Sequence, residues 1–401
     1  MPKTVVIVGA LDTKGVEFAF IKDLIEKEGL KTIVVDFGVM GEPTFTPQIT
    51  RREVAQAGGG DLDALASGEH KDQAMKVMAG GLAAVVRRLY EEGYLNGIIG
   101  MGGSGGTSIA TTGMRVLPVG VPKIMVSTVG GGDISAYTGT KDITFIPSIV
   151  DVAGINSISR AIYTNAAGAI AGMVKMETLP AQSGKPLVVA SMFGNTTKCV
   201  DMARKVVEDA GYELLVFHAT GAGGKTMESL IQDGYIVASM DITTTELADE
   251  VCGGVFSAGP ERCLAASRAG IPAVLVPGCV DMANFGGIDT VPEKYLQRNL
   301  YEWNPNVTLL RTNVEENMRM GKMIAAAANL STAPVTILLP LRGVSMLDSP
   351  GGRFWDPEAD QACYQAIKDN LKPGIPVIEM ENNINDPAFA EKIAQTLLEA
   401  M

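Results

Sequence analysis

The stretch VVIVGALDTKGVEFAFIKDLIEKEGLKTIVVD, residues 5–36, reads as a buried strand, a polar loop, an amphipathic helix and a second buried strand. Residues 187–218, LVVASMFGNTTKCVDMARKVVEDAGYELLVFH, repeat this plan. Continuous apolar strands that alternate with helices are typical of parallel sheets covered on both faces. At 401 residues the chain is also too long for one hydrophobic core. We therefore predict an α/β fold with two doubly wound domains, residues 1–180 and 181–401.

Further strands are expected throughout both halves. Apolar runs predict them at 4–8, 32–36, 97–101, 123–126, 144–147, 187–191, 213–218, 254–257, 273–276, 335–339 and 377–380. The main helices are expected to begin at Val16, Asp72, Thr107 and Gly154, and the stretch Glu177–Pro186 reads as a linker. Gene duplication and coincidence explain the similarity of the halves equally well. Strand ends of both sheets are expected to face a shared cleft.

Composition excludes several classes of protein. A net charge of −12, from 33 Lys and Arg against 45 Asp and Glu, argues against nucleic acid as a partner. The five cysteines form no CxxC pair and the histidines are only His70 and His218, which rules out zinc-finger and HExxH motifs. No apolar run reaches about 18 residues, so no membrane span is expected. The first residues lack the pattern of a signal peptide, so a cytoplasmic location is expected.

The strongest local signal is GIIGMGGSGGTSIA, residues 97–110, in which an apolar strand runs through Gly102–Thr107 into a helix. Such a turn presents free backbone N–H groups and a helix N-terminus, which together bind anions. It is neither a GxGxxG fingerprint followed by an acidic residue nor a P-loop. The alternative is that the glycines only allow the strand and helix to pack closely. We favour a phosphate or carboxylate ligand.

Other polar groups follow neighbouring strands of the first domain. Gly130–Gly132 and Asp133 form a second glycine loop, in which Asp133 is suited to a ribose hydroxyl or Mg²⁺. Asp12, Thr13 and Lys14 follow the first strand. Helix capping explains Asp12 or Thr13 equally well. The same alternative applies to Asp151 and Asn156.

The second half offers candidates for catalysis. Gly221, Gly223 and Gly224 form another possible anion turn, with Lys225 as a counter-charge, although the spacing is not that of a P-loop. Asp241 and Glu246 are acid/base candidates, for which a capping box is the alternative. An enzyme that needs no ATP would use His218, Glu228, Asp281 and Arg342.

Together, VVIVGALDTKG, GMGGSGGTS, STVGGGD, PSIVDVAGIN, FHATGAGGKTMESL, PGCVDMANFG and PLRGVS resemble the Tm-one-like ATP-binding domain family, an uncharacterised family. The resemblance covers nearly the whole chain. It implies two Rossmann-like domains, ATP binding with Mg²⁺, and a homodimer. The implied nucleotide contacts map to Asp12, Thr13, Lys14, Gly102, Gly103, Ser104, Gly105, Gly106, Thr107, Gly130, Gly131, Gly132 and Asp133.

Three functions remain open from the sequence. The first is a nucleotide-binding protein that holds ATP in an interdomain cleft, with a small anionic ligand as a possible second substrate. The second is an enzyme that acts on a sugar nucleotide or a carboxylate metabolite without ATP. The third is a non-catalytic protein that senses a metabolite. No acid/base pair stands at a fixed local spacing, so the sequence does not decide whether the chain is an enzyme.

Overall fold

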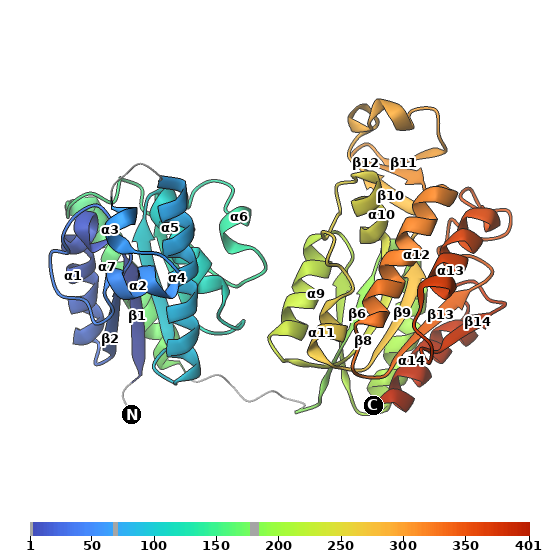
Figure 1. Cartoon of the computed structure of the whole chain (residues 1–401), viewed down its shortest axis with the longest axis horizontal. Helices are drawn as coiled ribbons and strands as arrows, with labels where there is room; N and C mark the ends of the chain where they lie inside the picture. Colours follow the sequence, from blue (N-terminus) through green and yellow to red (C-terminus); the bar gives the residue numbers. More distant parts are fainter. Residues whose placement is uncertain (1–2, 67–70, 177–183) are drawn as a thin grey trace. The chain divides into compact units, whose positions relative to one another are not determined.

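A computed structural model describes residues 3–66, 71–176 and 184–401 of the chain, which separates into two compact units, Met1–Leu179 and Pro180–Met401. Each unit is an α/β domain built on a parallel sheet with helices on both faces (Figure 1). The predicted doubly wound, Rossmann-like fold is therefore confirmed for each domain. Most of the predicted linker lies outside the described residues, as does His70.

The N-terminal domain has a five-stranded sheet in the order β2-β1-β3-β4-β5, with every neighbouring pair parallel. Its strands are β1 (Thr4–Gly9), β2 (Lys31–Asp36), β3 (Gly97–Gly102), β4 (Lys123–Ser127) and β5 (Thr144–Pro147). The strand order reverses between β1 and β3. Open α/β sheets bind their ligands outside the carboxyl ends of the strands at such a reversal.

Helices cover both faces of this sheet because its strands are apolar on both sides. They are α1 (Leu11–Lys27), α2 (Arg51–Ala57), α3 (Leu62–Leu65), α4 (Lys71–Glu91), α5 (Ser104–Arg115), α6 (Ser135–Thr138) and α7 (Ser157–Lys175). One core lies under α1 and α7, where Phe18 and Tyr163 are buried. The other lies under α2 to α5, where Met78 and Ile109 are buried.

The C-terminal domain has a six-stranded parallel sheet in the order β14-β13-β9-β8-β6-β7. Its strands are β6 (Leu187–Met192), β7 (Glu213–His218), β8 (Ile236–Thr243), β9 (Ala273–Gly278), β13 (Val335–Pro340) and β14 (Val377–Met380). Counted along the chain within each parallel sheet, the strand order is 2-1-3-4-5 in the N-terminal domain and 2-1-3-4-5-6 in the C-terminal domain. The two halves are thus built alike.

The helices of this domain again form two layers (Figure 1). They are α8 (Thr197–Asp209), α9 (Ala222–Gln232), α10 (Thr245–Cys252), α11 (Ala265–Ala269), α12 (Val314–Asn329), α13 (Pro357–Asn370) and α14 (Pro387–Ala400). Helices α8 and α14 pack on one face, and the others cover the opposite face. None of the helices described in either domain has the length and apolar character that crossing a membrane requires.

The strand predicted at Gly254–Ser257 is wrong. These residues form a loop after α10, in which Val255 is exposed and donates a single backbone hydrogen bond to Asn284. The third strand of the sheet is instead β8, which was not predicted. A small antiparallel sheet was also missed; it consists of β10 (Met282–Phe285), β12 (Val307–Arg311) and β11 (Leu300–Asn304) and lies at one end of the domain in Figure 1.

Several helices begin earlier or later than predicted. Helix α1 begins at Leu11 rather than Val16. Its first turn is separated from the rest of the helix by a kink at Lys14, where φ is −134°. Helix α5 begins at Ser104 rather than Thr107, so the predicted glycine loop forms its first turn. The loop between strand and helix is therefore only Gly103.

Two adjacent glycines of α4 should respond oppositely to the same substitution. A Cβ at Gly81 would lie 1.9 Å from the carbonyl oxygen of Val54 in α2, whereas a Cβ at Gly80 would meet nothing within 4 Å. We expect Gly81→Ala to lower the free energy of unfolding by about 1–3 kcal/mol through overpacking. Gly80→Ala should raise it by about 0.5–1 kcal/mol. Urea denaturation of both variants checks this, and equal effects would contradict the crossing of α2 and α4.

Candidate functional site

The N-terminus of α5 lies at the point where the strand order of the N-terminal sheet reverses. Its N-cap, Gly103, is extended (φ −76°, ψ −169°), and no side chain among the described residues caps the helix. The first N–H groups of a helix have no intrahelical partner. The N–H groups of Ser104, Gly105 and Gly106 are therefore available to an external acceptor. The helix dipole favours a negatively charged one.

Packing does not explain the glycines of this turn. A Cβ at Gly105 or Gly106 would have its nearest neighbour at 3.7 Å, and neither residue has a positive φ. Each glycine costs about 0.5–1 kcal/mol in a helix relative to alanine. Close packing explains only Gly102, whose Cβ would lie 3.2 Å from the Cα of Gly106. A ligand that lies against the backbone would account for the other two.

Thr107 and Gly102 belong to the framework of the turn. The hydroxyl of Thr107 is buried and lies 2.7 Å from the hydroxyl of Ser127 at the end of β4. The carbonyl of Gly102 accepts a hydrogen bond from the backbone N–H of Thr128. These contacts hold β3, β4 and α5 together, so Thr107 and Gly102 have a structural role.

The second glycine loop, after β4, is a series of tight turns. Gly130 and Gly132 donate to Ser127 and Val129, and Gly131 is exposed with open space around it. Asp133 accepts a hydrogen bond from the N–H of Ser135, which lowers the pKa of its carboxyl group. In the described structure, the carboxylate of Asp133 thus stabilises a turn within its own loop.

Two of the three candidate residues that follow β1, Asp12 and Lys14, form hydrogen bonds with other loops of the domain. Asp12 does not cap α1; its Oδ2 accepts hydrogen bonds from Met40 and Gly41 in the loop after β2. Lys14 donates from Nζ to the carbonyl of Val152, 2.5 Å away in the loop after β5. Thr13 is exposed. Lys14 therefore brings a cation to the ends of the strands.

One buried carboxylate in this domain was missed. Asp36, the last residue of β2, accepts hydrogen bonds from the N–H groups of Leu11 and Gly38. Burial raises the pKa of Asp36, and its Oδ2 has no hydrogen-bond partner among the described residues. An acidic residue at the carboxyl end of an apolar strand is the sequence signal that could have found it.

A cavity of about 510 Å³ lies beside the glycine turn. Its lining comes from the loops after β4 and β5 and includes Thr128, Gly131 and Asp151. The hydroxyl of Thr128 is 3.7 Å from the position that a Cβ on Gly103 would take. The turn and the cavity therefore adjoin, and together they form the candidate binding site. Asn156 caps α7, as the alternative interpretation held.

A glycine turn of the C-terminal domain, which lies between β7 and α9, is filled by the chain itself. Glu246 is fully buried, and its Oε1 accepts hydrogen bonds from the N–H groups of Gly221 (2.7 Å) and Gly224 (3.1 Å). Its other oxygen pairs with Arg262. Glu246 does not form the alternative capping box, because no side chain caps α10. An internal carboxylate thus takes the place that an anionic ligand would have.

Arg262 holds a buried cluster of charges that sequence reasoning missed. Its guanidinium is buried and contacts Asp241, Glu246 and Glu228. Burial raises the pKa of Glu228 to about 7, against the lowering effect of the nearby arginine. Glu228 also accepts the N–H of Cys263. The catalytic candidate Glu228 therefore lies in a cluster that joins α9, β8 and the loop after α10.

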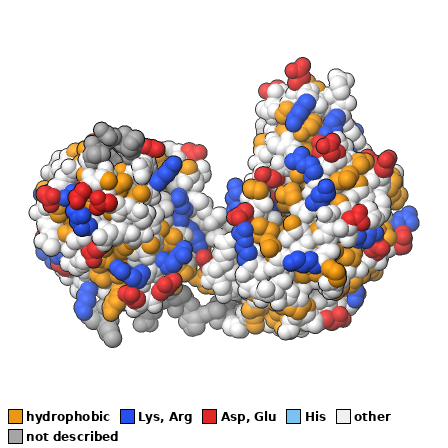
Figure 2. Space-filling view, in the orientation of Figure 1, with side chains coloured by type: hydrophobic (Ala, Val, Ile, Leu, Met, Phe, Trp, Pro, Cys, Tyr) orange, Lys and Arg blue, Asp and Glu red, His pale blue; other side chains and the backbone are white. Residues whose placement is uncertain are grey.

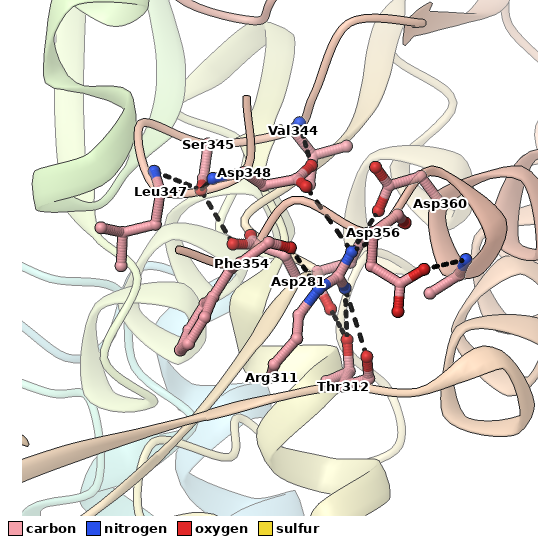
Figure 3. A network of polar contacts seen from close by, with 12 residues as sticks. Asp281, Arg311, Thr312, Val344, Ser345, Leu347, Asp348, Phe354, Asp356 and Asp360 are labelled. Atoms are coloured by element: carbon pink, nitrogen blue, oxygen red, sulfur yellow. Dashed lines mark hydrogen bonds and ion pairs between the residues drawn. The ribbon is translucent and has the colours of Figure 1, made fainter. Parts of the chain in front are cut away.

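Asp281 belongs to a second buried network (Figure 3). Its Oδ2 accepts a hydrogen bond of 2.8 Å from the hydroxyl of Ser345, and its Oδ1 has no partner among the described residues. Asp348 and Asp360 lie around the guanidinium of Arg311, at 3.6 and 2.7 Å. Burial and the charge of Asp348 raise the pKa of Asp281 to about 7 and that of Asp360 to about 9.

The remaining two catalytic candidates are exposed but far apart. His218 ends β7, where its ring lies 5.3 Å from that of Phe193, and Arg342 follows β13. Strands β6, β8 and β9 lie between β7 and β13. At about 4.8 Å per strand, the two strand ends are about 19 Å apart. The structure does not bring His218 and Arg342 together with Asp281 around one point.

No group of three or more His, Cys, Asp or Glu side chains in the described parts of the chain is placed to hold a metal ion. The expected Mg²⁺ stays a prediction, because Mg²⁺ that accompanies a nucleotide is usually held by only one or two carboxylates and the phosphates. Figure 2 shows acidic and basic side chains among apolar ones over the visible face of each domain.

Two family models match the chain. The N-terminal domain model of the Uncharacterised protein family (UPF0261) matches residues 3–179, and the C-terminal domain model matches residues 185–401.

Relatives match most or all of the chain. A UPF0261 protein of Clostridium tetani is 51% identical over 402 residues, which covers 100% of both chains. The ToMV resistance protein Tm-1(GCR237) of Solanum lycopersicum is 41% identical over 333 residues, which is 81% of this chain and 44% of the tomato protein. A putative UDP-N-acetylglucosamine 2-epimerase from Listeria monocytogenes is 9% identical, with 92% of this chain and 93% of that chain covered. Its TM-score of 0.25 is too low to support any argument about function.

Replacing Arg262 should lower the free energy of unfolding of the C-terminal domain. In Arg262→Met the carboxylates of Asp241, Glu246 and Glu228 lose the cation that they share, and breaking a buried pair typically costs about 3–5 kcal/mol. We expect a loss of that size in the free energy of unfolding, measured with urea. Arg268→Met removes an arginine whose ion pair with Glu261 is exposed, so its urea midpoint should stay near that of the parent chain. Similar midpoints for the two variants would contradict the burial of the cluster.

The raised pKa of Asp281 makes stability depend on pH. Between the usual value of 3.8 and about 7, the folded chain holds a proton that the unfolded chain releases. Stability therefore falls as the pH rises through this window, by at most about 1.4 kcal/mol per unit.

The expected difference between pH 5 and pH 8 is smaller in Asp281→Asn, because the variant cannot titrate at this position. Urea denaturation at both pH values measures it. Asp201→Asn, at an exposed position of α8, should keep the pH dependence of the parent chain. An unchanged dependence in Asp281→Asn would show that this carboxyl group does not titrate there.

Proposed function

This chain belongs to the Uncharacterised protein family (UPF0261), and from the geometry of its N-terminal domain we propose that it binds the phosphate groups of ATP at the turn Gly103–Gly106. The observation that carries the proposal is the uncapped N-terminus of α5, with two glycines that neither packing nor backbone geometry requires. ATP is the nucleotide that the motif resemblance implies.

The position of the turn supports the same function. It follows β3, at the reversal of strand order, where ligands of this fold class bind. Lys14 adds a positive charge at the same edge of the sheet through its contact with the loop after β5. The turn contains no P-loop lysine, so we expect weaker binding than in proteins with that motif. The proposal assigns Mg²⁺ no ligands from this chain.

The glycine turn between β7 and α9 of the C-terminal domain is not open to phosphate, because Glu246 already occupies it. We therefore place the nucleotide in the N-terminal domain alone. Closure of the second domain over ATP, a second anionic ligand and a homodimer stay predictions. Turnover of a sugar nucleotide or carboxylate, and sensing of a metabolite, remain the alternatives.

ATP should raise the melting temperature of the parent chain. At a concentration 100 times Kd, binding to the folded state alone adds about 2.7 kcal/mol, which corresponds to a shift of several degrees. Differential scanning fluorimetry with and without Mg²⁺ measures this shift. His218→Ala should keep it, since His218 lies in the other domain. No shift under either condition would rule the proposal out.

Gly103→Asp provides the sharper test. An aspartate at this extended N-cap should cap α5 and stabilise the free protein by roughly a few tenths of a kcal/mol, because glycine is itself a tolerated N-cap. The same carboxylate would occupy the N–H groups and repel phosphate, so the Kd for ATP should rise at least tenfold, measured by calorimetry.

The matched control is Gly194→Asp, which adds the same charge after β6, where a Cβ would have open space. It should leave the Kd for ATP unchanged. A Gly103→Asp variant that folds and keeps the parent affinity would exclude the turn as the phosphate site.

A further inference from the structure

A second cavity of the N-terminal domain, of about 340 Å³, lies at the loop that joins β2 to α2. Its lining includes Asp36 at the end of β2, Arg51 and Arg52 in α2, and Leu62 in α3. The described residues that line it include none of Gly103–Gly106. The volume lies in the range of small-ligand sites. This cavity is therefore distinct from the proposed phosphate site.

Asp36 brings to this cavity a buried carboxylate that is only half satisfied. The residue is fully buried, and its Oδ1 accepts hydrogen bonds from the N–H groups of Leu11 (3.0 Å) and Gly38 (2.8 Å). Its Oδ2 is also buried and has no hydrogen-bond partner among the described residues. A buried, charged oxygen without a donor is costly to the folded state. A ligand in the cavity would supply that donor.

The charges around Asp36 favour a cationic donor. Burial raises the pKa of Asp36 and the nearby carboxylate of Asp12 raises it further, while its backbone hydrogen bonds and Arg51 lower it. Asp12 itself has a buried oxygen, Oδ1, without a partner among the described residues. A hydroxyl donor would leave the buried charge of Asp36 uncompensated, whereas an ammonium group compensates it and donates up to three hydrogen bonds. The Asp36 side of the cavity therefore suits an ammonium group.

The arginines on the α2 side of the cavity suit an anion. Arg51 pairs with Glu42, whose side chain is 89% exposed, and ion pairs that are open to solvent contribute little. Arg52 likewise pairs with exposed carboxylates. A ligand carboxylate binds a guanidinium through two parallel hydrogen bonds, so it competes well with such partners. Arg51 is also close enough to Asp36 for its charge to lower the pKa of that carboxyl group, so one small molecule can contact both.

We propose that this cavity binds a free α-amino acid, whose ammonium group donates to Oδ2 of Asp36 and whose carboxylate pairs with Arg51. Leu62 and Pro47 add an apolar wall on which the side chain of the amino acid packs. The inference goes beyond ATP binding, because it uses other residues of the domain and a ligand that carries no phosphate. It gives the chain a second ligand class, a small zwitterion.

The first test is a ligand series on the full chain, with and without ATP. Differential scanning fluorimetry with each common L-amino acid should find at least one that raises the melting temperature, and calorimetry then gives its Kd. The 2-hydroxy acid with the same side chain lacks the ammonium group, and the amide of the amino acid lacks the carboxylate. Each analogue should bind at least tenfold more weakly than the amino acid.

Variants of the cavity then assign the two contacts. In Asp36→Asn the side chain keeps an acceptor for Leu11 and Gly38 but carries an NH2 group in place of the charged Oδ2. This variant should melt near the temperature of the parent, raise the Kd for the amino acid at least tenfold and keep the Kd for ATP. Arg51→Gln should raise the Kd for the amino acid at least fivefold. Asp23→Asn, at an exposed position of α1, is the matched control and should bind as the parent does.

The outcomes separate the amino-acid site from the ATP site. No amino acid bound under either condition, equal affinity for the amino acid and its 2-hydroxy analogue, or an unchanged Kd in Asp36→Asn would overturn the amino-acid site and leave the phosphate turn standing. A parent chain that binds an amino acid but no ATP would overturn the phosphate turn alone. If either cavity variant does not fold, the ligand series still decides the question, because it needs only the parent chain.

Discussion

Parallel pairing of β1 with β3 is the constraint on which the candidate site depends. The two strands run side by side in register from Val5 opposite Gly97, so their carboxyl ends leave the sheet together. Both faces of the sheet are covered by helices, and only the edge with the loops is free to bind. The reversal of strand order at this pair opens the space in front of α5. The arrangement places Asp12, Thr13 and Lys14 after β1 beside the turn Gly103–Gly106 after β3.

The two domains share a strand order but use their glycine turns differently. In the N-terminal domain the first N–H groups of α5 have no side-chain cap. In the C-terminal domain Glu246 reaches the turn before α9 and is itself held by Arg262. An anion is favoured at both turns for the same electrostatic reason. One domain supplies that anion from its own chain, and the other leaves the position to a ligand.

Much of the fold was predictable because local patterns decide it. The apolar runs at Thr4–Gly9 and Gly97–Gly102 are long and continuous, and the structure has strands there. The predicted strand at Gly254–Ser257 failed because these residues make a single backbone hydrogen bond to β10, from Val255 to Asn284, and form no ladder with a described strand. The antiparallel sheet β10-β12-β11 was missed because its strands have only four or five residues. β11 and β12 form a local hairpin, whereas β10 pairs with β12 across an interval that contains β11.

The candidate site was predictable only in part. The glycines from Gly103 to Gly106 stood out by residue type, but the internal use of Thr107 and Lys14 depends on partners 20 and 138 residues away. Arg262 carried no local signal at all, since its carboxylate partners come from α9, β8 and α10.

The sequence by itself determined two α/β domains and a glycine turn at a strand end, because hydrophobic period and glycine content act over a few residues. Tertiary structure decided which turn is open and which is filled, because a buried carboxylate such as Glu246 finds its partners only after the chain has folded.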